Sequence, residues 1–262
     1  MKVAIITGGS SGIGLACCEK FAANGYKVYE FSRKDAVHAN GIVHIKADVT
    51  DEQSVEAAVK SVFEKENRID VLVNNAGFGI AGSIEDTALI DAKKQFDVNF
   101  FGAFICAKKV LPFMRKQGFG RIVNISSMAA PLAIPFQGFY SASKAAINSL
   151  TLSLANEVKP FGITVCAVMP GDVKTGFTAA REKAITDSAY KDVLQKSLAV
   201  MEHDEQNGMP ASAIADAVFK AATAKNPKPL ATKGAQYHLF AGLSKVLPTG
   251  LVNRIVGMIY AK

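Results

Sequence analysis

The chain has 262 residues, of which 49% are hydrophobic, enough to bury one large core or two small ones. With 20% charged residues, this composition excludes intrinsic disorder, a collagen-like repeat and a small disulfide scaffold. The net charge of +7 is compatible with a nucleic acid, an anionic membrane or a phosphorylated ligand, but no run of five basic residues occurs, so a solvated basic surface is the simplest interpretation.

Short runs rich in β-branched residues alternate with longer segments of helical period. Strands are predicted at residues 3–7, 27–31, 42–45, 69–73, 121–125 and 163–168. Several are apolar throughout, which is typical of strands buried on both faces of a parallel sheet. Helices are predicted at residues 14–23, 52–66, 92–116 and 141–159. This order predicts a single-domain Rossmann-type α/β fold, a doubly wound parallel sheet with helices on both faces.

Past Gly171 the alternation weakens. Residues 172–208 are expected to form helix and loop, residues 210–225 a helix opened by proline, and residues 230–232 a last strand. No linker, repeat or low-complexity tract divides the chain, so residues 1–262 are expected to form one domain. The final stretch, residues 237–260, is apolar but interrupted by Lys245, Pro248, Gly250 and Arg254.

A glycine-rich turn, Thr7-Gly-Gly-Ser-Ser-Gly-Ile-Gly14, joins the first strand to the first helix. Gly8, Gly12 and Gly14 leave the backbone bare for a phosphate, and the new helix N-terminus offers free N–H groups. Glycine runs alone more often form a plain tight turn. The strand before and the helix after favour a dinucleotide site, although the spacing is G-x-x-x-G-x-G rather than G-x-G-x-x-G.

Further motifs follow on the expected elements. They are Asn74-Asn-Ala-Gly77 after the fourth strand, Asn99 in a long helix, Ser127 after the fifth strand, Tyr140-Ser-Ala-Ser-Lys144 opening the next helix, and Pro170-Gly171 after the sixth strand. With the glycine turn, this series resembles the short-chain dehydrogenase/reductase family, whose first motif is T-G-x-x-x-G-I-G. The resemblance spans residues 3 to about 175.

Tyr140 and Lys144 are four residues apart, so both side chains are expected on one face of a helix. A free phenol has a pKa of about 10, and a fixed ammonium nearby lowers that pKa because it favours the phenolate. The pair is therefore predicted to be a tunable acid and base. An isolated Y-x-x-x-K pair would more simply be a surface tyrosine and a solvated lysine.

The resemblance implies a role for each catalytic residue. Tyr140 would protonate a carbonyl oxygen or deprotonate an alcohol while hydride moves to or from the nicotinamide, and Ser127 would hydrogen-bond the same oxygen. Lys144 would also bind the nicotinamide ribose. Asn99 would hold a water that links Lys144 to solvent, unless it only bonds a neighbouring backbone group. Ser126 is the structural alternative to Ser127.

The resemblance also implies the cofactor contacts. Asn75, Ala76 and Gly77 would line the cofactor channel, while Asn74 steadies the sheet. Asp48, with Val49, would contact the adenine, unless Asp48 belongs to the N-cap region of the next helix, where Thr50 or Asp51 also qualifies. The remaining contacts come from the glycine turn and the P-G-x-V-x-T motif: Gly8, Ser10, Ser11, Gly12, Ile13, Gly14, Pro170, Gly171, Val173 and Thr175.

The end of the second strand predicts NADP(H). Ser32 stands where an NAD-selective acid is expected, and Arg33 can grip a 2′-phosphate with two hydrogen bonds. Glu30 keeps NAD open, because a shift of one residue in the strand boundary would bring this acid nearer the ribose.

The segment between Ser127 and Tyr140 is almost wholly apolar, which favours a hydrophobic ketone or secondary alcohol such as a steroid. Residues 1–170 would form the cofactor-binding and catalytic core, and residues 171–262 a substrate lid and tail. The tail resembles those of hydroxysteroid and retinol-type members; packing on its own domain, a dimer contact and membrane-surface docking are the alternatives. Four lid residues could line the substrate site or form ordinary helix core: Phe177, Tyr190, Leu194 and Met201.

A 3-oxoacyl thioester reductase is the nearest rival function. A non-catalytic NADP(H)-sensing protein is the rival of another class, and the intact Ser127, Tyr140 and Lys144 disfavour it. No nucleic-acid partner is expected, because basic residues do not cluster with aromatic ones. The family implies a homodimer or homotetramer formed through the helices at residues 92–116 and 141–159.

The four cysteines form no C-x-x-C pair and no histidines have zinc-ligand spacing, so no metal site is expected. Cys17, Cys18, Cys106 and Cys166 are better suited to a reduced, cytoplasmic setting. The N-terminal run is too short for a signal peptide and lacks a cleavage site. The sequence contains no stretch of 18 apolar residues, so no membrane span is predicted.

Overall fold

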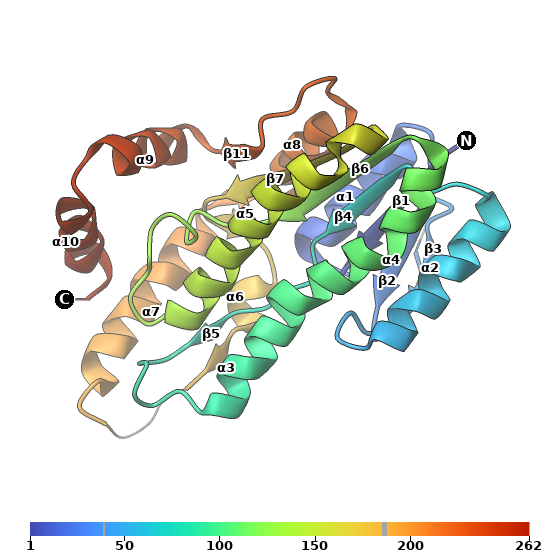
Figure 1. The fold of residues 1–262 in the computed structure, drawn as a ribbon. Coiled ribbons are helices and arrows are strands. Elements are labelled where there is room, and N and C mark those ends of the chain that lie inside the picture. The colour runs from blue at the N-terminus through green and yellow to red at the C-terminus, as the bar shows by residue number, and fades with distance from the viewer. Residues whose placement is uncertain (39, 185–187, 262) are drawn as a thin grey trace.

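The computed structural model describes residues 1–38, 40–184 and 188–261. A parallel sheet of seven strands lies at the centre, in the order β11-β7-β6-β4-β1-β2-β3 (Figure 1). The strands are β1 (Lys2–Thr7), β2 (Tyr26–Ser32), β3 (Val43–Lys46), β4 (Val71–Asn74), β6 (Gly120–Ile125), β7 (Ile163–Pro170) and β11 (Leu230–Lys233). The predicted doubly wound Rossmann-type sheet is confirmed, and every predicted strand is present within two residues of its expected bounds.

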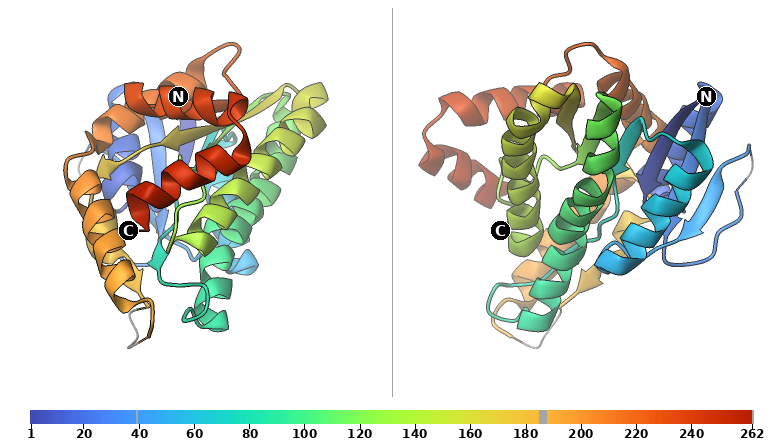
Figure 2. Two further views of the ribbon diagram at one scale, coloured as in Figure 1. Left: turned by 90° about the vertical axis from the view of Figure 1, so that its left-hand side faces the viewer. Right: turned by 45° about the vertical axis from the view of Figure 1, so that its right-hand side comes forward.

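Helices cover both faces of the sheet, as Figure 2 shows. One face packs against α2 (Glu52–Glu66), α4 (Gly102–Gln117) and α5 (Gly138–Val158). The opposite face packs against α1 (Gly12–Ala23) and α8 (Ala211–Thr223).

Strand β1 shows why its sequence is apolar throughout. Val3 and Ile5 belong to the core on the α2 and α4 side, whereas Ala4 and Ile6 belong to the core on the α1 and α8 side. Successive side chains of a strand point to opposite faces of the sheet, so the side chains on both faces of β1 are buried.

The long helix expected at residues 92–116 is divided. It consists of α3 (Leu89–Phe96), a π-helical segment η1 (Asp97–Phe101) and then α4. A single helical period does not reveal such a segment, which changes the turn over only five residues. The buried Asn99 lies within η1, so the irregular turn is also the one that carries a predicted site residue.

Shorter elements after β7 form the predicted lid, and one of them pairs with β5 (Ile80–Ala81), which lies between β4 and α3. They are α6 (Phe177–Ala180), α7 (Lys191–Gln206), the small pair β8 (Val173–Lys174) with β10 (Met209–Pro210), and β9 (Glu182–Lys183), the partner of β5. A 3-10 turn, η2 (Lys159–Phe161), precedes β7. Residues 185–187 of the predicted lid lie outside the described residues.

The C-terminal tail forms two helices, α9 (Ala235–Val246) and α10 (Thr249–Tyr260). They stand beside the sheet, with α9 against β11 and α10 against α7 (Figures 1 and 2). Of the residues that interrupt this apolar stretch, Pro248 is the N-cap of α10, and Gly250 and Arg254 lie inside α10. In the described part of the chain, no helix has the length and apolar character needed to cross a bilayer.

Candidate active site

A cavity of about 1120 Å³ lies where the central strands end. Its lining begins with Gly8 after β1, Ser32 at the end of β2, Asn75 after β4, Ser127 after β6 and Gly171 after β7. Parallel strands bring their carboxyl ends to one edge of a sheet, so residues from distant parts of the sequence meet there.

The glycine turn is shaped for close approach of a ligand to the backbone. Gly8 has a φ of 65°, and a Cβ on Gly14 would lie 2.2 Å from the carbonyl oxygen of Gly8. Ser11, the N-cap of α1, makes no side-chain hydrogen bond to the first turn of the helix. The bare backbone and uncapped helix N-terminus fit a dinucleotide phosphate.

Strand β4 continues into a loop that is fastened to this turn. The backbone N–H groups of Asn75 and Ala76 both donate to Thr7 Oγ1 at 3.0 Å, and Asn75 Nδ2 donates to Gly8 O at 3.1 Å. Asn74 Nδ2 donates to Asn124 Oδ1 at 2.9 Å, which ties β4 to β6 as expected.

Nearly all of the predicted cofactor contacts line the cavity. The residues concerned are Gly8, Ser10, Ser11, Gly12, Ile13, Ser32, Arg33, Asp48, Val49, Asn75, Ala76, Gly77, Tyr140, Lys144, Pro170, Gly171, Val173 and Thr175. Gly14 packs behind the turn instead. Asp51 is the N-cap of α2 and accepts from Gln53 N and Ser54 N. In the turn before it, Asp48 Oδ1 accepts from Thr50 N at 2.9 Å and from Thr50 Oγ1 at 2.8 Å, so Asp48 lines the cavity and also belongs to this N-cap region.

Glu30 does not reach the cavity. Its side chain is fully buried and accepts hydrogen bonds from His44 Nδ1 at 2.6 Å and His38 Nε2 at 3.3 Å. The alternative boundary of the second strand, which would bring Glu30 nearer the ribose, is therefore wrong.

Lys144 and Tyr140 lie together at the start of α5. The Nζ atom of Lys144 donates to Ile125 O at 2.8 Å and lies 5.8 Å from the centre of the Tyr140 ring. Burial lowers the pKa of Lys144 to about 8. Burial also raises the pKa of Tyr140 to about 12, although its hydrogen bond with Ser127 opposes the rise. The expectation of a lowered phenol pKa is wrong for the cofactor-free chain, because desolvation outweighs the favourable contacts.

The two neighbouring serines have different surroundings. Ser127 makes a side-chain hydrogen bond with Tyr140, and its hydroxyl accepts a hydrogen bond from Ala129 N at 3.1 Å. The buried Ser126 instead donates a hydrogen bond to Lys144 O at 3.3 Å. The contacts support the choice of Ser127 as the substrate-facing serine and give Ser126 a positioning role.

Asn99 approaches Lys144 from η1 but is occupied by other groups. Its Oδ1 accepts from Phe78 N, and its Nδ2 donates to Phe78 O, both at 3.0 Å, and to Ser143 Oγ at 3.2 Å. These bonds fix the loop after β4, which is the simpler of the two interpretations of Asn99. Its relay role stays a prediction.

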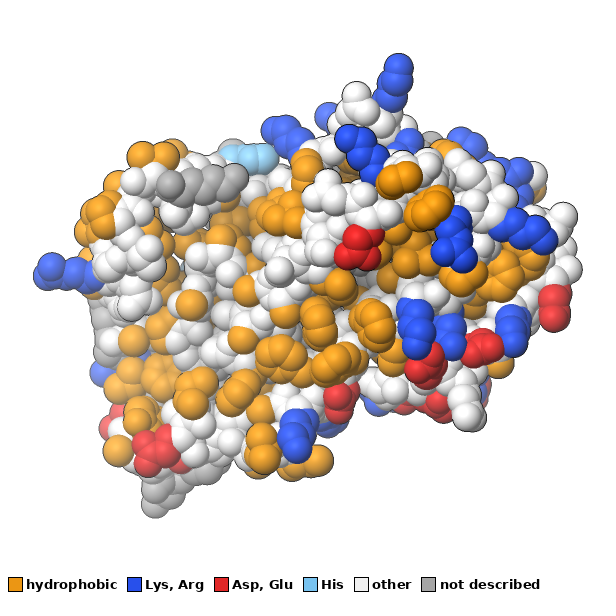
Figure 3. Space-filling model, viewed as in Figure 1, with side chains coloured by type: hydrophobic (Ala, Val, Ile, Leu, Met, Phe, Trp, Pro, Cys, Tyr) orange, Lys and Arg blue, Asp and Glu red, His pale blue; other side chains and the backbone are white. Residues whose placement is uncertain are grey.

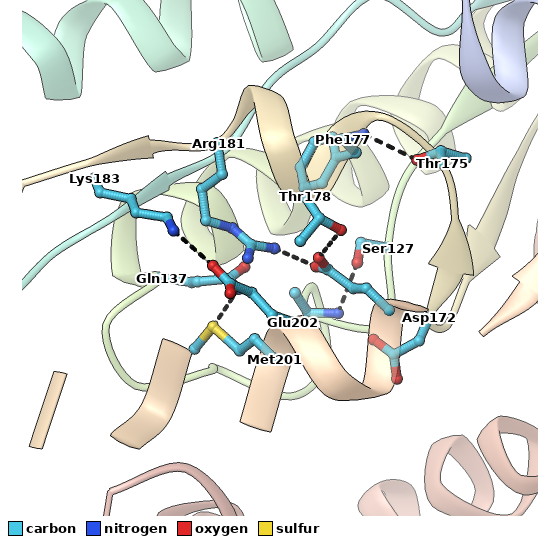
Figure 4. A network of polar contacts seen from close by, with 12 residues as sticks. Ser127, Gln137, Asp172, Thr175, Phe177, Thr178, Arg181, Lys183, Met201 and Glu202 are labelled. Carbon is cyan, nitrogen blue, oxygen red and sulfur yellow. Dashed lines mark hydrogen bonds and ion pairs between the residues drawn. The ribbon is translucent and has the colours of Figure 1, made fainter. Parts of the chain in front are cut away.

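A polar network between residues 178–183, which span the end of α6 and β9, and α7 borders the substrate end of the cavity (Figure 4). Arg181, which is 5% exposed, pairs with Glu205, and Thr178 Oγ1 donates to the same carboxylate at 2.6 Å. Lys183 pairs with Glu202 at 2.6 Å. This network is not predictable from the sequence, because no motif links an arginine to an acid 24 positions away.

The apolar part of the cavity combines a wall from the segment before α5 and the lid with a second wall from the C-terminal tail, which the sequence analysis also assigned to the substrate end. Met128, Ala129, Leu132 and Ile134 come from the segment before α5, and Phe177 and Met201 from the predicted lid. Tyr190 is instead exposed and bonds Glu85, and Leu194 is packed in a small core, so both are wrong as lining residues. The second wall comes from the C-terminal helices and their connection: Phe240, Leu243, Leu247, Val252, Ile255, Val256 and Ile259.

Comparison with known proteins agrees with this geometry. The family described as short chain dehydrogenase matches residues 2–186. A 3-ketodihydrosphingosine reductase of Bacteroides thetaiotaomicron is 39% identical, with 99% of this chain and 98% of that protein covered. An NADPH-dependent 3-dehydrocapnine reductase of Ornithobacterium rhinotracheale is 28% identical, with 97% and 96% covered.

A solved short-chain dehydrogenase from Streptomyces avermitilis superimposes with a TM-score of 0.84 at 30% identity, with 97% of each chain covered. Other solved neighbours hold NAD in one case and NADP in another. The fold and the nicotinamide class of cofactor therefore agree with the prediction from the sequence. The choice between NAD and NADP depends on this chain's own residues.

Proposed function

The chain belongs to the short-chain dehydrogenase family, and on this premise we propose that it is an NADP(H)-dependent oxidoreductase that reduces the ketone of a long-chain lipid-like substrate. One observation carries the proposal: the cavity that holds Ser127 and Tyr140 continues between apolar walls to α9 and α10. Residues 1–170 serve as the cofactor-binding and catalytic core, and residues 171–262 as lid and tail.

The mechanism needs few residues. When bound, the nicotinamide supplies the hydride that reduces the carbonyl carbon. Ser127 hydrogen-bonds the carbonyl oxygen, and Tyr140 gives it a proton. With a pKa of about 12 in the cofactor-free chain, Tyr140 holds its proton at neutral pH and so can act as the general acid in ketone reduction. Lys144 binds the ribose of the cofactor and, once charged, stabilises the phenolate that Tyr140 leaves.

The shape and polarity of the cavity favour a lipid with one polar end over a steroid. Near Tyr140 the lining includes Asp172 and Glu205, and Tyr237 donates a hydrogen bond to Asp172. The lining from α10 is apolar except for Tyr260, whose phenol lies near Asp172 and Glu205. Similarity to reductases of 3-ketodihydrosphingosine and 3-dehydrocapnine supports the same choice. A steroid and a 3-oxoacyl thioester are the rival substrates, and a catalytically silent NADP(H) sensor is the rival function.

The test of function follows NADPH absorbance with the purified chain and a series of 3-keto lipids of increasing chain length. Each methylene buried adds up to about 0.8 kcal/mol, so kcat/KM should rise several-fold for every two methylenes added until the cavity is full. A steroid ketone and acetoacetyl thioester serve as comparators. Faster reduction of either comparator than of every 3-keto lipid would overturn the substrate assignment.

A matched pair of substitutions in α10 tests the C-terminal wall. Ile255→Asn places an amide in the apolar lining and should lower kcat/KM for a long-chain ketone about tenfold, while a short-chain ketone is reduced as before. Met258→Asn is the control, because Met258 is 49% exposed and does not line the cavity. Equal effects of the two variants would contradict a lipid path along α10.

Arg33 should set the preference for NADPH. Arg33 lines the cavity next to Ser32 and is exposed, so its guanidinium is available to a 2′-phosphate. Arg33→Asp should lower the ratio of kcat/KM for NADPH over NADH about 100-fold, since a charge-assisted pair is lost and a repulsion gained. Arg115→Asp, an exposed arginine on α4, is the control. An unchanged ratio in Arg33→Asp would discredit the NADP(H) assignment.

The proposal extends to assembly and location. The outer surface of α4 and α5 exposes Phe104 at 41% and Leu152 at 43%, and Phe101 beside them at 47%. Figure 3 shows hydrophobic side chains gathered across the face that these helices present. This surface supports a homodimer or homotetramer formed through α4 and α5. Four buried free cysteines favour a reducing, cytoplasmic setting.

A further inference from the structure

Behind the glycine turn, one buried acid meets two of the four histidines. Glu30 lies on β2 directly opposite His44 of β3, and His38 comes from the connection between these strands. The carboxylate and both ring nitrogens lie within 4.8 Å of one another. The side chains are well shielded, with exposures of 0% for Glu30, 6% for His38 and 15% for His44.

The hydrogen bonds within this cluster leave two buried polar atoms without partners. Both imidazoles approach the same atom, Glu30 Oε2, while Glu30 Oε1 and His44 Nε2 have no partner in the described part of the chain. Neither a lysine nor an arginine among the described residues pairs with Glu30. A buried carboxylate oxygen with no donor is costly, so the arrangement points to a missing positive group.

We propose that Glu30, His38 and His44 form a binding site for a divalent cation of the Zn²⁺ type. The cation takes His38 Nε2, His44 Nδ1 and one oxygen of Glu30, for which the unpartnered Oε1 is available, and a water would complete the tetrahedron. Any protons that the two nitrogens donate to Glu30 leave as the metal binds. Two imidazoles and one carboxylate suit Zn²⁺, whereas Mg²⁺ prefers oxygen ligands in an octahedron.

Linear spacing does not reveal this site. The three residues follow one another at intervals of eight and six, which matches no helical or hairpin zinc motif, so the sequence predicts no metal. The β2–β3 pairing places Glu30 and His44 side by side. The connection between β2 and β3 then brings His38 close to both residues.

The metal would steady the adenosine end of the cofactor cavity. The connection that carries His38 also carries Arg33, Lys34, Asp35 and Ala36, which line that end. The metal would link His38 to Glu30 and His44 of the sheet and so restrict this connection. Binding of the cofactor would then cost less conformational entropy. This consequence depends on the proposed NADP(H) site, whereas the metal site itself does not.

The test uses the full chain without an affinity tag, stripped of metal and titrated with Zn²⁺ alone against a chromophoric chelator. One Zn²⁺ should bind per chain, and Co²⁺ should give the strong visible absorption of a tetrahedral site. Mg²⁺ in large excess should not displace either. A full chain that binds no Zn²⁺ overturns the proposal.

Three variants locate the site. Glu30→Gln, His38→Asn and His44→Asn should each weaken Zn²⁺ binding about 100-fold or more, as loss of a ligand requires. His238→Asn is the control, because His238 is exposed on α9. Binding of NADPH, followed by its fluorescence, reports that each variant is folded. If all three folded variants bind Zn²⁺ as tightly as the control does, the metal lies elsewhere and the assignment is wrong.

Discussion

Tyr140→Phe should lower turnover about 1,000-fold while NADPH binding changes less than about twofold. The substitution removes the only atom of Tyr140 that can give a proton to the substrate, and general acid catalysis contributes about 10²–10⁴-fold to such rates. The ring is retained, including its packing against Phe177 at 5.8 Å between centroids, so the cavity keeps its shape. The measurements are kcat from NADPH absorbance at saturating ketone and the Kd of NADPH from its fluorescence.

Tyr190→Phe is the matched control. Tyr190 is exposed and donates to Glu85 at 2.9 Å, outside the cavity lining, so its phenol should be dispensable for turnover. Near-normal turnover of Tyr140→Phe would refute the mechanism. A wild-type chain that binds NADPH but reduces none of the ketones, with Tyr140→Phe binding equally well, would instead support the sensor function.

Lys144→Met should abolish most turnover and yet make the cofactor-free chain more stable. The pKa of Lys144 falls from 10.5 to about 8 because its ammonium is buried, which corresponds to about 3 kcal/mol of lost stability near neutral pH. Methionine fills a similar volume without charge. Leaving Ile125 O without its donor costs about 1 kcal/mol. The expected gain in unfolding free energy at pH 7 is therefore about 2 kcal/mol.

The dependence on pH identifies the cause of this gain. Between pH 8 and about 10.5 the unfolded chain binds a proton at Lys144 that the folded chain does not, so wild-type stability rises with pH across this window. The variant lacks this contribution, so its advantage should be largest below pH 8 and become a deficit of about 1 kcal/mol, from the lost hydrogen bond, above about pH 10.5. Denaturant unfolding at several pH values measures it. The exposed Lys116→Met is the control, and a constant advantage at all pH values would exclude the desolvation explanation.

The sheet and the first half of the site could be predicted from sequence because their signals are local. A buried parallel strand reads as a continuous apolar run, as Val3 to Ile6 do. The glycine turn and the Tyr140–Lys144 pair are short motifs. The turn lies between β1 and α1 and the pair lies on α5, so a single local element fixes the position of each. Strand order then brings Gly8, Asn75 and Ser127 to one edge of the sheet.

The remainder depends on contacts between distant segments. Arg181 meets Glu205 only because α6 packs on α7, and Glu30 meets His44 only because β2 pairs with β3. The direction of the Tyr140 pKa shift also depends on packing, since burial opposes the favourable hydrogen bond from Ser127. No periodicity in the sequence reports how much water a folded cavity excludes.

The last part of the chain, which includes the C-terminal helices that wall the cavity, makes the distribution of charge along the sequence uneven. Residues 217–262 hold seven of the 30 basic residues and no acidic one, so residues 1–216 carry 23 of each sign. The whole net charge of +7 therefore belongs to the last part of the chain, which includes α9 and α10. Exposed basic side chains of this part attract anionic molecules over a range of about 8 Å at physiological ionic strength, and added salt weakens this attraction without affecting the buried acid and base.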